Sequence, residues 1–205
     1  MSEYEDKVLK QFITDVRDHE MSVEHDDGVF RHLRFRKPDA WLYHYEITTW
    51  PGHLTITGDM GTFTFARLHD MFQFFNEPRI NAGYWAEKLR ATDTMGGHTS
   101  FSKEKFRAQV EEQLAAHVER QDDAFRIDGR MARLRRDIEH DVMDEMYSEE
   151  AAMAAVRDFY DHSGRGFTFN LDDWDNTEYR FQFLWCLNAI RWGIEQHNAR
   201  EKVDA

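Results

Sequence analysis

The sequence has one cysteine, three prolines and no long run of apolar residues. A single cysteine cannot form a disulfide within the chain, and Cys186 lies in the apolar stretch 181–194, so we expect a buried thiol in a reducing compartment. No uninterrupted apolar stretch approaches the roughly 18 residues of a membrane span, and the first residues lack the basic and apolar segments of a signal peptide. These absences argue against secretion and membrane insertion, and they predict a cytoplasmic protein.

Short motifs that mark several large enzyme classes are also missing. The sequence contains no P-loop, no dinucleotide-binding glycine fingerprint, no HExxH motif, no paired CxxC motif and no nucleophile elbow. No catalytic residue, metal or cofactor is therefore assigned. A binding protein is favoured over an enzyme.

The composition is that of a folded acidic protein. The chain has 205 residues, of which 41% are hydrophobic and 14% aromatic, and it is long enough to bury a core without metal or disulfide support. We therefore predict a single α+β domain over residues 1–205. The formal charge is −13, so direct binding to nucleic acid or to an anionic membrane is not expected, because both carry negative charge.

The charge is distributed unevenly. Residues 139–178 contain twelve acidic and two basic residues, a net charge of −10, whereas residues 31–37 contain four basic and no acidic residues. The first segment would attract a basic partner, and the second would attract a small anion.

Side-chain alternation predicts an antiparallel four-stranded β-meander over about residues 29–67. Apolar and polar residues alternate along four short runs, and turn residues separate these runs. Short connections make neighbouring strands antiparallel. One face of this sheet collects the apolar side chains, which are Leu33, Phe35, Trp41, Tyr43, Tyr45, Ile47, Leu54, Ile56, Phe63 and Phe65. The other face is polar, so helices are expected to cover only the apolar face.

Apolar residues at helical spacing predict helices on both sides of the sheet in the sequence. Residues 3–19 form an amphipathic N-terminal helix, and the apolar stretch 181–194 belongs to a C-terminal helix at the centre of the fold. Ser102 and Ser148 are predicted N-caps of two further helices. Other helices are expected at residues 68–75, 82–92 and 131–146. A short strand at residues 167–169 is expected to add an edge to the sheet.

The polar face of the predicted sheet is the first candidate site. Arg34 and Arg36 lie near His44 and Glu46 if the first two strands pair. Two guanidinium groups on a rigid sheet could hold a phosphate or carboxylate in bidentate fashion. The simpler interpretation is an exposed face with cross-strand Arg–Glu pairs, each worth about 0.2–1 kcal/mol. A small anionic ligand is expected on this face if it binds anywhere on the protein.

The acidic segment is the second candidate site. Asp141, Asp144, Glu149 and Glu150 are assigned as partner-binding residues. Asp137, His140 and Asp144 also share one helix face, which would suit a hard cation. A solvated acidic face interleaved with arginines is the simpler interpretation of that face, so no metal is assigned.

Two loops could carry chemistry, but they are predicted at opposite ends of one strand. They are the segments Trp50-Pro51-Gly52-His53 and Gly58-Asp59-Met60-Gly61. Asp59 could act as a general base, although an acid in a turn more often bonds its own backbone.

Four motifs stand out in the first half of the sequence. They are Arg34-Phe35-Arg36-x-Pro38, then Thr49-Trp-Pro-Gly-x-Leu-x-Ile-x-Gly-Asp-Met-Gly-Thr-x-x-Phe-x-Arg67, then Asp70-Met-Phe-x-Phe-Phe75 and Ile80-Asn-x-x-Tyr-Trp-Ala-Glu-Lys88. Together they resemble a family of short proteins of bacteriophage and prophage genomes. The resemblance covers about residues 34–97 and carries no activity, catalytic residue or cofactor with it. It implies a phage accessory protein that acts in the cytoplasm of the bacterial host.

Three functional hypotheses follow. The leading one is a binding protein that inhibits a host system, such as an antiviral defence, by presenting its acidic surface to a basic host protein that handles nucleic acid. The alternative is a small-ligand protein that sequesters or hydrolyses a nucleotide or another phosphoester on the polar sheet face. The third is a structural or regulatory phage protein that forms a homodimer through exposed aromatic residues.

Overall fold

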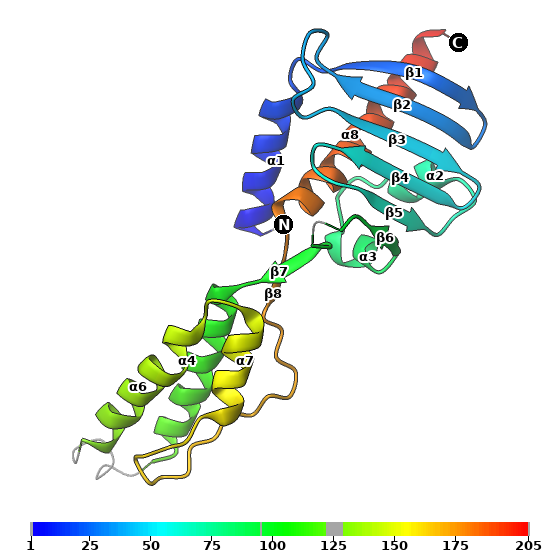
Figure 1. The fold of residues 1–205 in the computed structure, drawn as a ribbon. Coiled ribbons are helices and arrows are strands. Elements are labelled where there is room, and N and C mark those ends of the chain that lie inside the picture. Colours follow the sequence, from blue (N-terminus) through cyan, green and yellow to red (C-terminus); the bar gives the residue numbers. More distant parts are fainter. Residues whose placement is uncertain (1, 95, 122–128, 205) are drawn as a thin grey trace. The chain divides into compact units, whose positions relative to one another are not determined.

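The computed structural model describes residues 2–94, 96–121 and 129–204, which form two compact units (Figure 1). Unit 1 comprises Met1–Ser100 and Tyr179–Ala205, and unit 2 comprises Phe101–Glu178. Each unit has its own cluster of buried apolar side chains. The predicted single domain over residues 1–205 assumed one core. That the two clusters fold as one domain stays a prediction.

Unit 1 contains a six-stranded sheet in which all neighbouring strands are antiparallel and follow the order of the sequence. The strands are β1 (Glu20–Asp27), β2 (Phe30–Arg36), β3 (Tyr45–Trp50), β4 (His53–Gly58), β5 (Phe63–Ala66) and β6 (Leu89–Thr92). The α+β class and the antiparallel arrangement are confirmed. The predicted number of four strands is only roughly matched, because β1 and β6 add one strand at each edge of the sheet.

The apolar face of the sheet matches the predicted alternation at eight of its ten positions. Leu33, Phe35, Tyr45, Ile47, Leu54, Ile56, Phe63 and Phe65 are all buried. Trp41 and Tyr43 were predicted as strand residues of the same face, but they lie in the turn that precedes β3. Tyr43 is half-buried and still packs against the core of unit 1. Trp41 is 61% exposed, and Tyr43 has a φ of 62°, which no strand residue adopts. Pro38 ends the preceding strand run, and the chain needs the next residues to reverse its direction.

Helices from both ends of the chain pack on this apolar face, as predicted (Figure 1). The N-terminal helix α1 (Glu3–Val16) begins with a capping box formed by Ser2 and Glu5, and it buries one stripe of side chains. The C-terminal helix α8 (Phe181–Asp204) contributes Trp185 and Ile190 to the core. Two short helices, α2 (Met71–Phe75) and α3 (Ala82–Ala86), precede β6.

Gly193 shows how closely α8 approaches the sheet. A Cβ atom at this position would lie 2.7 Å from Cδ1 of Ile47 and 3.0 Å from the ring of Phe35. Only glycine therefore lets the helix backbone come this near to β2 and β3 without displacing a core side chain.

Unit 2 is mainly helical. It contains α4 (Lys103–Glu119), α6 (Arg130–Asp141), the short 3-10 helix η1 (Met143–Glu145) and α7 (Glu149–Asp158). The predicted N-caps are confirmed, since Ser102 Oγ accepts from the amide of Lys105 and Ser148 Oγ accepts from the amide of Ala151. Residues 167–169 do not form the predicted strand. The ring of Phe167 is buried in the core of unit 2 instead.

Two further strands, β7 (Thr99–Phe101) and β8 (Thr177–Tyr179), pair with each other in a separate two-stranded sheet. Among the described residues, no helix has the length and apolar character needed to cross a membrane.

Candidate functional site

The polar sheet face is occupied by ion pairs between neighbouring strands. The register of β2 and β3 places Arg34 opposite Glu46, and Arg34 Nε donates to Glu46 Oε1 over 2.9 Å. Arg34 also donates to Glu24 of β1, and His32 Nε2 lies 2.6 Å from Glu46 Oε2. Partial burial acts to raise the pKa of Glu46, but the hydrogen bonds and charges of His32 and Arg34 outweigh it and lower the pKa.

The threonines of this face are also paired with each other. The hydroxyls of Thr55 and Thr64 lie 2.9 Å apart, as do those of Thr57 and Thr62. Cross-strand pairs of this kind stabilise a sheet. The geometry of the central strands therefore matches the simpler interpretation of this face, in which its polar groups bind each other.

Arg36 and His44 are not part of the hydrogen-bonded Arg34–Glu46 pair, and both lie beside the ring of Trp41. The guanidinium of Arg36 is 5.1 Å from the centroid of the Trp41 ring, and the ring of His44 is 5.2 Å from it. His44 was predicted as a strand residue of the polar face, but it belongs to the turn before β3. The structure thus divides the four predicted ligand-binding residues into two pairs.

Asp59 holds this turn in place. Its Oδ2 accepts from the amide of Tyr43 over 2.6 Å, and its Oδ1 lies 2.9 Å from Nδ1 of His44. The carboxylate therefore bonds a backbone group that is distant in sequence, as well as an imidazole. This contact stabilises the left-handed conformation of Tyr43, which would otherwise be unfavourable.

The four predicted partner-binding residues lie close together in the sequence of unit 2 and are all exposed. Asp141 is the last residue of α6, Asp144 lies in η1, and Glu149 and Glu150 begin α7. The side chains between them that face the core are Val142, Met143 and Met146. Because these apolar side chains point inward, the carboxylates point to solvent. We call Asp141, Asp144, Glu149 and Glu150 the acidic strip.

Two residues beside the acidic strip affect its charge and its exposed apolar surface. His140 Nδ1 lies 2.7 Å from Asp141 Oδ1, and this hydrogen bond raises the pKa of His140, with a further contribution from the charge of Asp141. Tyr147 lies between Asp144 and Glu149 in the sequence and is 73% exposed. Exposed tyrosines are common where protein surfaces bind each other.

By its sequence, a hard cation could suit the helix face that carries Asp137. Its carboxylate lies 3.9 Å from Nε of Arg133, one turn earlier in α6. Within the residues that the structure describes, no group of three or more His, Cys, Asp or Glu side chains is placed to hold a metal ion.

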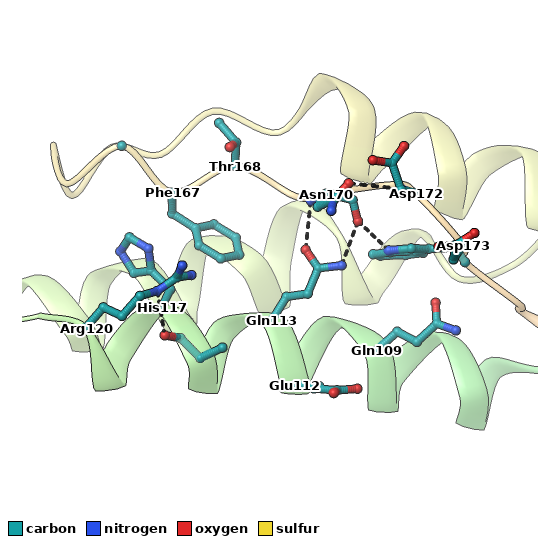
Figure 2. Close-up of a pocket in the computed structure, with 13 residues that line it drawn as sticks. Gln109, Glu112, Gln113, His117, Arg120, Phe167, Thr168, Asn170, Asp172 and Asp173 are labelled. Carbon is teal, nitrogen blue, oxygen red and sulfur yellow. Dashed lines mark hydrogen bonds between the residues drawn. The ribbon is translucent and has the colours of Figure 1, made fainter.

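Unit 2 also contains a cavity of about 660 Å³ between α4 and residues 166–174 (Figure 2). Gln113 donates to the carbonyl of Asn170 over 2.7 Å and accepts from its amide over 2.8 Å, while Trp174 Nε1 donates to the same carbonyl. His117, beside the ring of Phe167, has its pKa lowered by burial. The polar groups that line the centre of this cavity are therefore bonded to each other, and they fasten the loop to the helix.

Sequence reasoning did not find this cavity, because Gln113 and Asn170 are far apart in the sequence and belong to no motif. No family model, curated protein or solved structure matches the chain.

Proposed function

We propose that the protein is a non-catalytic binding protein whose acidic strip contacts a basic surface of a partner protein. The observation that supports this proposal is the alternation between exposed carboxylates and buried apolar side chains along residues 141–150. The apolar side chains anchor this segment to the core of unit 2. The carboxylates are therefore displayed from a supported backbone and not from a loose tail.

The charge of the protein suits a basic partner. A concentration of negative charge accelerates association with a positive surface and disfavours wrong partners. Proteins that handle nucleic acid carry such positive surfaces, because they must bind phosphates. In the phage context that the resemblance implies, the partner is a host protein of this kind, and binding inhibits an antiviral defence system.

Tyr147 supplies the apolar part of the proposed interface. Charged residues at the rim of an interface contribute mainly to specificity and association rate, whereas a buried aromatic side chain contributes much of the affinity. Tyr147 is 73% exposed and sits within the acidic strip. We therefore place it at the centre of the contact.

A pull-down from infected bacterial cells tests the proposal. The test variant neutralises the acidic strip with Asp141→Asn, Asp144→Asn, Glu149→Gln and Glu150→Gln. The matched control removes the same charge from exposed positions of α4 with Glu104→Gln, Glu111→Gln, Glu112→Gln and Glu119→Gln. We expect the test variant to lose its partner and its effect on phage survival, and the control to retain both. Equal retention by the two variants would contradict the proposal.

The small-ligand alternative on the polar sheet face has less support. Arg34 is hydrogen-bonded to Glu46 and Glu24, and Glu46 is also hydrogen-bonded to His32. An anion would therefore have to displace a carboxylate to reach Arg34. Displacement leaves that carboxylate without its partner, which opposes binding. Arg36 is the guanidinium of this face that would be available, and Arg36→Gln is the variant that tests the alternative.

A further inference from the structure

Unit 1 contains a cavity that the sequence analysis did not identify. It has a volume of about 680 Å³ and is lined mainly by residues 67–68 and 73–85, which lie between β5 and β6 in the sequence. Its lining includes Arg67, Leu68, Arg79 and Tyr84. Pockets for small ligands commonly have volumes of about 300–1,000 Å³, so a molecule of nucleotide size fits.

Two exposed arginines line this cavity, and their guanidinium groups are available to a ligand. Neither Arg67 nor Arg79 makes a side-chain hydrogen bond or ion pair with any part of the chain that the structure describes. Two half-buried arginines of unit 1, Arg31 and Arg34, are paired instead. Arg31 makes a bidentate contact with Asp70, at 2.9 and 3.2 Å, and Arg34 pairs with Glu46. Free guanidinium groups in a protein of charge −13 mark the cavity as a place where an anion is tolerated.

The cavity also offers apolar surface beside the arginines. Tyr84 is 41% exposed and Leu68 is 42% exposed, while Phe74 and Trp85 of the same lining are buried beneath. The ammonium of Lys88 lies 4.4 Å from the centroid of the Tyr84 ring, and its charge is paired with the carboxylate of Glu87 over 2.9 Å. A planar apolar group could therefore lie against this surface while its charged end meets the arginines.

Two carboxylates also line the cavity, and only one of them is free to accept hydrogen bonds from a ligand. Glu5 accepts a hydrogen bond from the amide of Ser2 over 2.6 Å as part of the capping box of α1. Glu77 is exposed and could accept hydrogen bonds from a ligand. The ligand should therefore carry hydroxyl or amino donors in addition to its anionic group.

We propose that this cavity binds a nucleoside monophosphate. Arg67 and Arg79 hold the phosphate, the base lies against Tyr84 and Leu68, and Glu77 accepts hydrogen bonds from ribose hydroxyls or from an amino group of the base. A free nucleotide is favoured over a nucleic-acid strand, because the net charge of −13 repels an extended polyanion. This site is separate from the acidic strip, and the proposal does not depend on the proposed function.

Isothermal titration of the full-length protein tests this site. The probes are adenosine 5′-monophosphate and uridine 5′-monophosphate, each raised to about 5 mM, which detects an affinity down to about millimolar. We expect at least one of them to bind. Arg67→Gln and Arg79→Gln should each weaken that binding by about tenfold or more, as expected for loss of a charge-assisted hydrogen bond. Tyr84→Leu should weaken it by a smaller factor.

Arg90→Gln is the matched control, since Arg90 is an exposed arginine of β6 that does not line the cavity. Its variant should bind like the unchanged protein, and thermal unfolding of every variant verifies that it is folded. Absence of binding by both nucleotides would overturn the proposal, as would equal weakening by Arg90→Gln. Inorganic phosphate that binds as tightly as a nucleotide would overturn the role of the apolar surface, and a single-stranded oligonucleotide that binds more tightly would overturn the assignment to a free nucleotide.

Discussion

His140 gives the acidic strip a charge that depends on pH. Its Nδ1 atom is 2.7 Å from Asp141, and both the hydrogen bond and the charge of that carboxylate raise the pKa of His140. Below the raised pKa, the imidazolium offsets part of the negative charge of the strip. Above it, the imidazole is neutral and the full negative charge remains.

Binding of a basic partner should therefore strengthen as the pH rises through the pKa of His140 and weaken as the pH falls through it. The measurement is the dissociation constant of the captured partner between about pH 6 and 8. His140→Gln should remove this part of the pH dependence. His162→Gln, which changes another exposed histidine of unit 2, should leave it intact. An identical pH profile in all three proteins would rule out this role for His140.

At the scale of elements, the edge strands of the sheet were the hardest to predict. β1 contains an exposed and mostly acidic second half, a composition that disfavours a strand. β6 follows α3 directly, and its residues continued a helical pattern in the sequence. Both strands form because an adjacent strand supplies their hydrogen-bond partners, a condition that a local pattern cannot reveal.

The loop after α7 depends on one buried carboxylate. Asp161 is 8% exposed, and it accepts hydrogen bonds from the amides of Ser163, Arg165 and Phe167 over 2.7, 3.2 and 2.9 Å. Burial acts to raise the pKa of Asp161, but these hydrogen bonds outweigh it and lower the pKa. The carboxylate thus replaces the ordinary backbone pairing that this loop lacks.

Asp161→Asn should destabilise unit 2 by about 1–3 kcal/mol, because an amide cannot accept at both of its positions. The folded-state pKa is lowered, so the stabilisation is present above the unfolded-state pKa of about 3.9 and is lost as the pH falls through the lower folded-state value. Urea unfolding at several pH values measures both effects. The control is Asp158→Asn, an exposed change at the end of α7. Equal stability of the two variants would contradict this role.

At the scale of the whole molecule, the main question is whether the two cores unfold together. Leu134 is completely buried in unit 2, and Ile47 is completely buried in unit 1. Truncating either side chain to alanine should cost about 2–5 kcal/mol. If each core is a separate cooperative unit, the loss will be confined to the unit that carries the change.

Hydrogen exchange measured by mass spectrometry distinguishes the two cases. We expect Leu134→Ala to accelerate exchange in α4, α6 and α7 and to leave the six-stranded sheet protected. Ile47→Ala should show the reverse pattern. Uniform acceleration across the chain in either variant would instead support the single domain that the sequence predicts.

The sequence by itself determined the features that depend on neighbouring residues. Alternation along β2 to β5 defined which side chains are buried, and Ser102 and Ser148 were identified as N-caps, because both signals arise within a few residues. Only the tertiary structure decided the partners of Arg34, the turn that removes His44 from the sheet face, and the cavity of Arg67 and Arg79. Ion pairs and cavities are formed by segments that are distant in the sequence, and local periodicity carries no information about which of them meet.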